Sequence, residues 1–456
     1  MGCFSSKKRE LEFVVPPQQG KGGSAAAGKP SEDGLSLLPG SPQHPVQGNA
    51  SDGDYVSSSR LSVRYQTKEY SGRGSASARK ANPPFDRSLI GTQTRHGLMP
   101  GPRGFSAAKI NQDRGLVCWP FNGSHNQALL CVFDGHGSKG ESASEFCMKT
   151  IPELLERDSS ALKSDPSATL SKVVIKTDEL LLGSPSLGKT AMTCGTTSTV
   201  CYLHGNDLWV ACSGDSRAVK GSRRNGAILA EDLSVDHKPD LPEEKRRIQA
   251  AGGSVSDTAA GRPSRVWAHG RIGLAMSRSI GDGECKKVGV IPDPEITHTV
   301  VAPAASMDKD GGDGDLFVIV ASDGIWEFIQ SAEACAMVYK HKSATDACSA
   351  LVLEAAQRWK RFEGHYRDDI TCIVAHLPFL RADRSEEQTT GQHTDSAVDE
   401  ESMYVSVPVV ASNDLPDEDV SAPAENGGQD FASRRLSVHN PYDDDWNSGD
   451  DSDGRP

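Results

Sequence analysis

The chain has 456 residues and a formal net charge of −13, and 36% of its residues are hydrophobic. This length suffices for one large domain or for two to three ordinary ones, but the hydrophobic content is low for a chain that is globular throughout. The charge is uneven: residues 1–100 carry +5 and residues 381–456 carry −14. No region is basic enough to indicate nucleic-acid binding, and no apolar run reaches the length of about 18 residues that indicates a transmembrane helix.

The eleven cysteines are scattered and form no C-x-x-C pair. Neither a zinc site nor an iron–sulfur cluster is therefore indicated. An odd number of cysteines without framework spacing is typical of a reducing compartment. No apolar segment near the start has the form of a signal peptide.

The first ten residues, MGCFSSKKRE, match the M-G-x-x-x-[ST] pattern of N-myristoylation. Gly2 is the predicted myristoylation site, and Cys3 beside it is a candidate for palmitoylation. Two acyl chains, or one chain with the basic residues 7–9, anchor a protein stably to anionic lipid. We therefore expect the protein at the cytoplasmic face of a plasma or internal membrane, and otherwise in the cytoplasm. The alternative is a disordered start that carries these residues by chance.

Composition divides the chain into three parts. Residues 1–89 are rich in Gly, Ser, Pro and Gln and are predicted to form an acylated, disordered tether. Residues 90–378 are predicted to form the folded domain, and residues 379–456 an acidic, disordered tail. Ser62 in SRLSV and Ser437 in RRLSV follow basic residues, which makes both candidate phosphorylation sites; the alternative is that both are unmodified.

The predicted elements of the folded part fall into separate groups of strands and of helices along the chain. A strand over 127–133 stops at an Asp-Gly pair and is followed by a helix over 141–157. Residues 196–219 predict a hairpin that turns near 205–206, and residues 242–253 predict a helix that ends in glycines. A strand from 315 stops at a second Asp-Gly pair, helices follow over 331–341 and 345–362, and a last strand begins after residue 368. This grouping predicts an α+β fold with helices packed over antiparallel sheet.

Acidic residues mark the ends of these strands. The set comprises Asp113, Asp134, Asp215, Asp323 and Asp368. Strand ends meet at the rims of packed sheets, so these carboxylates can converge although they are far apart in the sequence. Converging carboxylates repel one another unless a cation compensates, and oxygen ligands alone favour Mg²⁺ or Mn²⁺. Each Asp-Gly pair taken singly is more simply explained as a turn.

The ordered motifs of residues 90–378 resemble those of metal-dependent type-2C protein serine/threonine phosphatases, the PPM family, in the form found in plants, algae and protists. The motifs are NQD 111–113, FDGHG 133–137, GTTST 195–199, SGDSR 213–217, DHKPDLPEEKRRIQAAGG 236–253, LAMSRSIGD 274–282, ASDGIWE 321–327 and RDDIT 367–371. The resemblance implies a four-layer sandwich of two antiparallel β-sheets flanked by helices. It also implies a two-metal site at one end of that sandwich.

The resemblance assigns metal ligands at matching positions. Asp134 bridges two Mg²⁺ or Mn²⁺ ions, and Gly135 supplies a carbonyl oxygen to one of them. Asp323 and Asp368 complete the shell of the second ion, and Asp113 acts through a bound water molecule. These assignments come from the family resemblance and not from spacing.

Further roles follow from the same resemblance. Asp215 and Glu327 match positions that hold a third, more weakly bound ion. His136 matches the general acid, and an imidazole can protonate a leaving oxygen near neutral pH. Arg278 and Asp282 match a segment beside the site and are interpreted as structural.

The sequence departs from the family at the position that binds the substrate phosphate. Animal members carry an arginine where this chain has Ala108. Lys109 is the nearest cation and is a candidate for that role, while a solvated surface lysine is an equal alternative. Gln112 and Glu327 replace a glutamate and an aspartate of other members, and neither change removes a central ligand.

These observations predict a membrane-tethered Mg²⁺- or Mn²⁺-dependent phosphatase with a monomeric catalytic domain. It would hydrolyse phosphoserine and phosphothreonine in protein substrates by attack of a water molecule activated by two metal ions. The alternatives are a catalytically silent scaffold of the same fold and a structural metal-binding domain. A hormone-receptor target, suggested by Trp267, is left open beside the simpler interpretation of a core aromatic.

Overall fold

The computed structural model describes residues 63–66, 86–101, 105–258, 263–377, 379 and 438–439, which all lie in one compact unit. The predicted acylation and phosphorylation sites lie outside the described residues; they are Gly2, Cys3, Ser62 and Ser437. No helix in the described part of the chain is both long and apolar enough to cross a bilayer.

The first large sheet has six strands in the order β1-β5-β6-β9-β10-β17, and neighbouring strands are antiparallel except for the parallel pair β1 and β5. Its strands are β1 (Val63–Gln66), β5 (Arg114–Cys118), β6 (Gln127–Phe133), β9 (Ser198–His204), β10 (Asp207–Ser213) and β17 (Glu295–Val300). The predicted hairpin is the β9–β10 pair, and the two-residue turn between these strands falls at 205–206 as expected.

The second large sheet has five antiparallel strands in the order β12-β11-β18-β19-β2. Its strands are β2 (Ile90–Arg95), β11 (Arg217–Arg224), β12 (Ala227–Asp232), β18 (Gly314–Ala321) and β19 (Ile370–His376). The pairing of β11 with β18 shifts register at Gly221, where a Cβ atom would lie 2.1 Å from the ring of Phe317. Only glycine fits this close approach.

The two large sheets bury a shared core between their inner faces. Residues of β5, β6, β9 and β10 contact residues of β11, β18 and β19 there; among them are Val117, Leu130, Cys201, Val210, Ala218, Val318 and Ile373. The central strands β5, β6, β9, β18 and β19 also bury alternate side chains against the helices on the outer faces, which explains why apolar residues predominate on both of their faces. All ten cysteines of the described residues are free and buried.

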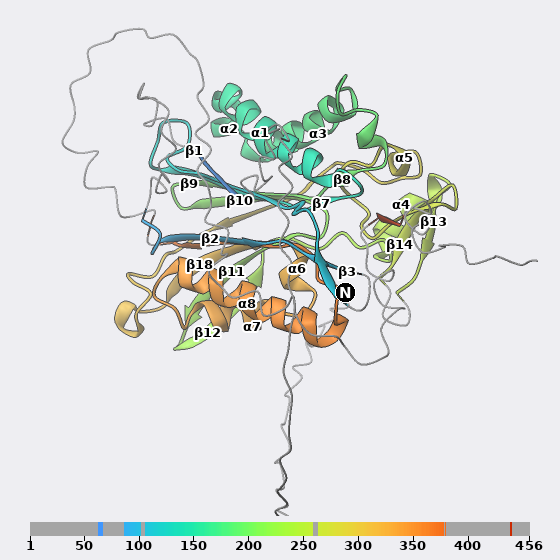
Figure 1. The fold of residues 1–456 in the computed structure, drawn as a ribbon. Helices are drawn as coiled ribbons and strands as arrows, with labels where there is room; N and C mark the ends of the chain where they lie inside the picture. Colours follow the sequence, from blue (N-terminus) through green and yellow to red (C-terminus); the bar gives the residue numbers. More distant parts are fainter. Residues whose placement is uncertain are drawn as a thin grey trace, which may run out of the picture. The chain divides into compact units, whose positions relative to one another are not determined.

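Helices cover both outer faces and complete four layers (Figure 1). The first sheet is covered by α1 (Gly140–Arg157) and α3 (Pro166–Leu182), with the short α2 (Ser159–Ser164) between them in sequence. The second sheet is covered by α6 (Asp323–Trp326), α7 (Ser331–Val338) and α8 (Ala344–Glu363). The predicted α+β four-layer sandwich is therefore confirmed.

Several smaller elements complete the fold. A side sheet, β13-β14-β15-β20, packs with α4 (Pro242–Ala250) and α5 (Gly283–Lys286) around a separate small core. The remaining elements are β3 (Leu98–Pro100), β4 (Ser106–Ala108), β7 (Gly135–His136), β8 (Gly195–Thr196), β13 (Ser254–Ser256), β14 (Arg265–Ala268), β15 (Ile272–Leu274), β16 (Ile280–Gly281), β20 (Val438–His439) and the 3₁₀ turns η3 (Thr190–Met192) and η4 (Lys309–Gly311). The edge strands β1 and β20 belong to the segments predicted as tether and tail; most of those segments lies outside the described residues.

Candidate active site

The acids predicted from the strand ends come from both large sheets. Asp113 directly precedes β5 and Asp134 directly follows β6 in the first sheet. Asp323 begins α6 just after β18, and Asp368 lies two residues before β19 in the second. Asp215 lies in the connection between β10 and β11, which crosses from one sheet to the other. The antiparallel order of the strands therefore brings these five positions to one rim of the sandwich.

The carboxylates are close enough to alter one another's ionisation. Burial and the charges of Asp113, Asp323, Asp368 and Asp215 hold the pKa of Asp134 well above its usual range. Burial together with the other acids likewise raises the pKa of Asp323 well above that range. The pKa of Asp113 rises to about 7 for the same reasons. A cluster of this kind is unfavourable when ionised unless positive charge is supplied to it.

Three of these carboxylates each have one buried oxygen, Oδ1, without a hydrogen-bond partner among the described residues: Asp113, Asp215 and Asp323. Unpaired buried carboxylate oxygens are costly, and oxygens of this type are the ligands that Mg²⁺ and Mn²⁺ favour. The residues present therefore fit divalent cations in their chemistry. Within the described residues, no group of three or more His, Cys, Asp or Glu side chains is already arranged around one point.

Asp113 is fixed by contacts from both sheets, although it is fully buried. Its Oδ2 accepts a hydrogen bond of 2.8 Å from the Ser322 hydroxyl, and that hydroxyl accepts one of 3.0 Å from the backbone N–H of Thr371. Its own backbone N–H donates to Oδ1 of Asn111 at 3.0 Å. These bonds hold one carboxylate oxygen and leave the other available.

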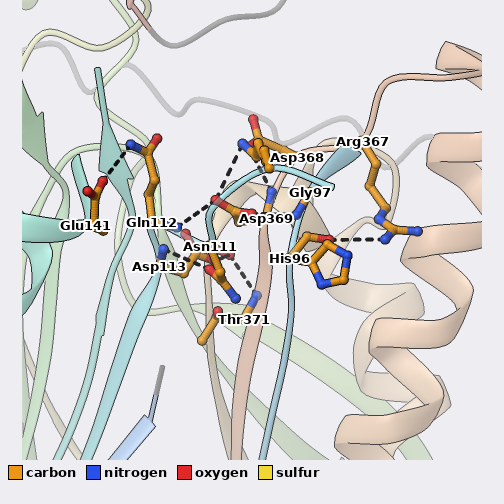
Figure 2. A network of polar contacts seen from close by, with 12 residues as sticks. His96, Gly97, Asn111, Gln112, Asp113, Glu141, Arg367, Asp368, Asp369 and Thr371 are labelled. Atoms are coloured by element: carbon orange, nitrogen blue, oxygen red, sulfur yellow. Dashed lines mark hydrogen bonds and ion pairs between the residues drawn. The ribbon is translucent and has the colours of Figure 1, made fainter. Parts of the chain in front are cut away.

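A second network ties the loop before β5 to the loop before β19 (Figure 2). Asp369 accepts backbone N–H bonds from Gly97 at 2.5 Å and from Gln112 at 2.9 Å. The Gln112 amide donates to the Gly137 carbonyl at 2.7 Å and to Glu141 at 3.1 Å. Gln112 therefore links the segments that carry Asp113, Asp134 and Asp368, which explains how the glutamine is accommodated at this position.

Lys109 lies on this network and is not a solvated surface lysine. Its Nζ is 2.5 Å from Oδ1 of Asp368 and 3.4 Å from Oδ2 of Asp369, and its side chain is 20% exposed. Both carboxylates raise the pKa of Lys109, which offsets the opposing effect of burial. The structure thus places the predicted phosphate-binding cation against a predicted metal ligand. A role toward substrate phosphate stays a prediction.

Lys238 is a second cation in the site, and sequence reasoning missed it. Its Nζ is 2.5 Å from Oδ2 of Asp215, and Asp323 also contributes to raising its pKa. The lysine lies in the DHKP stretch, 23 residues beyond its partner. The sequence did contain a signal, because a lysine within the motifs of an acid-rich site can neutralise one of the carboxylates. Nothing in the spacing of the residues indicates which carboxylate it contacts.

The segment of residues 134–136 is held in place from behind. The backbone N–H of Asp134 donates to the Thr197 hydroxyl at 2.9 Å, and Thr197 N–H donates to the Asp134 carbonyl at 2.8 Å. A Cβ on Gly135 would lie 2.4 Å from the carbonyl oxygen of Gly140 and 2.6 Å from that of Gln112. These backbone carbonyls leave no space for a side chain at position 135, so only glycine allows the backbone to take this path.

His136 forms a buried pair with Asp282. Its Nε2 lies 2.7 Å from Oδ2 of the carboxylate, and the two side chains are 3% and 2% exposed. Burial alone would raise the pKa of Asp282, but His136 and the Ser279 hydroxyl hold it below its usual range. Asp282 was interpreted from sequence as structural; the structure puts it in direct contact with the predicted general acid.

Glu327 and Arg278 lie at the margin of the site. Glu327 is exposed and follows Asp323 by one helical turn, so it lies beside the acids without sharing their burial. Arg278 donates to the Glu244 carboxylate of α4 at 2.7 Å and to the Asp293 carbonyl at 3.0 Å. These contacts fit the structural role expected for Arg278.

Comparison with known proteins agrees with this arrangement. The sequence profile of the family described as protein phosphatase 2C matches residues 101–361. The chain belongs to this family of protein serine/threonine phosphatases, which is metal-dependent, generally with Mg²⁺ or Mn²⁺.

Individual relatives are plant proteins. "Probable protein phosphatase 2C 35" of Arabidopsis thaliana is 31% identical over 296 residues, which cover 60% of this chain and 81% of the relative. "Probable protein phosphatase 2C 59" of Oryza sativa subsp. japonica is 36% identical over 258 residues, covering 55% and 68%. The solved structure of serine-threonine phosphatase 2C from Toxoplasma gondii matches with a TM-score of 0.50 and 23% identity over 62% of this chain and 98% of that one, which supports the fold.

Proposed function

We propose that the protein hydrolyses phosphoserine and phosphothreonine in protein substrates, using two divalent cations held by the acids at the rim of the sandwich. The observation that carries this proposal is the set of buried, unpaired carboxylate oxygens on Asp113, Asp215 and Asp323. They lie at ends of elements from both sheets, in the same region as His136. Family membership supports the reaction type.

Residues of both sheets would hold the two ions. Asp134 and Gly135 would hold the ions from the first sheet, and Asp323 and Asp368 from the second, with Asp113 acting through bound water. When bound, two such ions activate a water molecule and offset the negative charge on the phosphoryl oxygens. Protein groups then need to orient the phosphate in line with that water and to protonate the leaving oxygen.

Phosphate release from a phosphothreonine peptide tests this proposal. The wild-type protein should require Mn²⁺ or Mg²⁺ and lose turnover in EDTA. Asp134→Asn and Asp323→Asn should each reduce kcat by about 10³-fold or more, because each removes a charged ligand from the reacting centre. Asp257→Asn is the matched control, since this acid is exposed and forms a surface ion pair with Lys245. Full activity in EDTA, or in both ligand variants, would contradict the proposal.

A catalytically silent scaffold of the same fold is the competing function. Both functions require a folded sandwich, so circular dichroism does not separate them. Turnover does: a scaffold would bind a phosphopeptide without releasing phosphate, whatever the metal. The retained acids and His136 favour the enzyme.

We further propose that the protein is held at the cytoplasmic face of a membrane by acylation of Gly2 and Cys3. The support is the MGCFSSKKRE sequence, in which two acylation sites precede three basic residues. In cells, the wild-type protein should sediment with membranes and Gly2→Ala should move to the soluble fraction. Cys3→Ser should give intermediate retention, since one acyl chain binds only marginally. Gly2→Ala that stays on membranes would refute the tether.

A further inference from the structure

We propose that Asp282 is a positioning residue that holds His136 through Nε2 and thereby makes Nδ1 the ring nitrogen that protonates the leaving oxygen of the substrate. This inference rests on the proposed phosphatase function. It assigns to Asp282 a role beyond the structural one, and it assigns the proton to a particular atom.

The hydrogen bond between the two residues determines which ring nitrogen carries a proton. A carboxylate can only accept, so the 2.7 Å contact between Oδ2 of Asp282 and Nε2 of His136 requires a hydrogen on Nε2. Burial excludes water that could compete for either partner, because the exposed fractions are only 3% and 2%. The ring is therefore fixed in the tautomer that carries its hydrogen on Nε2 whenever it is neutral.

The remaining nitrogen of His136 is buried and has no hydrogen-bond partner among the described residues. A polar atom left in this state is unfavourable unless a substrate or a water molecule meets it in the working enzyme. When the ring carries both hydrogens, the hydrogen on Nε2 is bonded to Asp282 and the hydrogen on Nδ1 is not. Nδ1 is consequently the nitrogen that can give a proton to a substrate.

The turn that carries Asp282 is constrained to present its carboxylate. The Ser279 hydroxyl donates to the same Oδ2 at 2.6 Å, and the Asp282 backbone N–H donates to the Cys194 carbonyl at 3.0 Å. The residue has φ of +51°, a left-handed conformation that aspartate tolerates better than most side chains. A Cβ on Gly195 would lie 2.2 Å from Oδ2, so a glycine is required opposite the carboxylate. These features fix the oxygen that His136 meets.

The proton transfer balances with the hydrolysis. A water oxygen forms a bond to phosphorus while the bond from phosphorus to the serine or threonine oxygen breaks and leaves its electron pair on that oxygen. The oxygen takes the proton from Nδ1, and His136 is left neutral with its hydrogen on Nε2, held by Asp282. The attacking water loses a proton to solvent and His136 regains one from solvent. The net change is one ester and one water converted to an alcohol and phosphate.

A matched control supports the same turn from helix α3. Asp178 of α3 accepts the backbone N–H of Gly281 at 2.7 Å and lies 3.2 Å from Lys286, but it does not contact His136. Asp178→Asn therefore disturbs the support of the turn without touching the imidazole. Asp282→Asn removes the carboxylate charge that faces His136 and keeps the side-chain size.

Leaving-group dependence separates a positioning role from a structural one. The full-length protein in Mn²⁺ is assayed on a phosphothreonine peptide and on 4-nitrophenyl phosphate, whose phenolate leaves without prior protonation. Asp282→Asn should lower kcat on the peptide by about 10- to 100-fold with KM changed less than about threefold, and the fall on 4-nitrophenyl phosphate should be at least about tenfold smaller. Asp178→Asn should lower kcat on the peptide and kcat on 4-nitrophenyl phosphate by the same factor. An equal loss on both substrates in Asp282→Asn would overturn the proposal.

Nitrogen NMR of the metal-free protein supplies a readout that does not depend on turnover. Wild-type protein should show His136 with its hydrogen on Nε2, assigned by loss of the signal in His136→Ala. Asp282→Ala should lose that preference and Asp178→Asn should keep it. A hydrogen on Nδ1 in the neutral wild-type ring would overturn the assignment. Absence of wild-type turnover overturns the proposed function together with this proton transfer, whereas turnover without leaving-group discrimination in Asp282→Asn overturns the positioning role alone.

Discussion

Replacing Asp113 by asparagine should stabilise the metal-free protein at neutral pH, even though it removes a predicted ligand. Asp113 is fully buried, and its pKa is raised from 3.8 to about 7, mainly by burial and then by the neighbouring charge of Asp369. The folded chain therefore holds this proton more tightly than the unfolded chain does. An asparagine of the same shape carries no charge and escapes the penalty.

The size and the pH window of the effect follow from these two values. Below about pH 3 the Asp113 carboxyl is protonated in both states and does not affect the pH dependence. As the pH rises from about 4 to about 7, the unfolded chain gains from ionising and the folded chain does not, so stability is lost. At 1.36 kcal/mol per pH unit, the difference between 3.8 and about 7 corresponds to about 4 kcal/mol.

Urea unfolding in EDTA at pH 4.5 and at pH 8 measures this loss. The wild-type protein should lose about 3 kcal/mol more free energy of unfolding between these pH values than Asp113→Asn does, because about 1 kcal/mol of the total is already lost at pH 4.5. This difference includes the effect of the Asp113 charge on the ionisation of Asp134 and Asp323. Asp257→Asn, an exposed aspartate whose side chain is 71% accessible, should follow the wild type within about 0.5 kcal/mol. The same pH dependence for wild type and Asp113→Asn would refute the argument that buried charge repulsion acts at Asp113.

Three further outcomes are expected. Glu244→Gln should cost about 3 kcal/mol in urea unfolding at pH 7, because two arginines and a serine hydroxyl converge on this buried carboxylate. Glu243→Gln, at an exposed position of the same helix, should unfold like the wild type. Because the pKa of Glu244 is lowered to about 2, the wild-type advantage over Glu244→Gln should be lost as the pH falls from about 4.5 to about 2. Gly135→Ala should abolish metal-dependent phosphate release and lower the free energy of unfolding by about 2 kcal/mol or more, since its Cβ meets two backbone carbonyls; wild-type turnover in this variant would show that the segment can move aside. Lys238→Gln should tighten Mn²⁺ binding about three- to tenfold in calorimetric titration, because its ammonium neutralises Asp215 at 2.5 Å; unchanged affinity would mean that Asp215 takes no part in binding.

The strand signals predicted an α+β fold with helices over antiparallel sheet, because the strands are short apolar runs that end at turn residues, and the resemblance to the family implied the four-layer sandwich. The run over 127–133 and the hairpin around 205–206 are local signals that tertiary packing did not override. Helix α3 was not predicted, although Leu170, Val173, Val174 and Leu181 are buried on one face at helical spacing. Its β-branched valines favour strands, and this weakened the helical signal.

The partners of the site residues could not be predicted in the same way. Asp134, Asp323 and Asp368 were found because each follows or precedes a strand, which is visible in the sequence. The contact of His136 with Asp282 spans 146 residues and depends on how the turn after β16 packs against β8. The contact of Lys109 with Asp368 spans 259 residues and depends on the pairing of β2 with β19. Such contacts are set by chain topology and leave no periodic signal.

The acids of the site are divided between the two sheets, and this division has a mechanical consequence. Asp113 and Asp134 belong to the first sheet, and Asp323 and Asp368 belong to the second. A divalent ion that takes ligands from both pairs would link the two sheets at this rim of the sandwich. The affinity for the metal ion would then depend on how the two sheets are aligned. Substitutions in the core between the sheets would therefore lower the metal affinity without touching a ligand. Loading with Mn²⁺ should slow amide hydrogen exchange in β5 and β6 of the first sheet and in β18 and β19 of the second sheet together, because the ion would restrain both sheets.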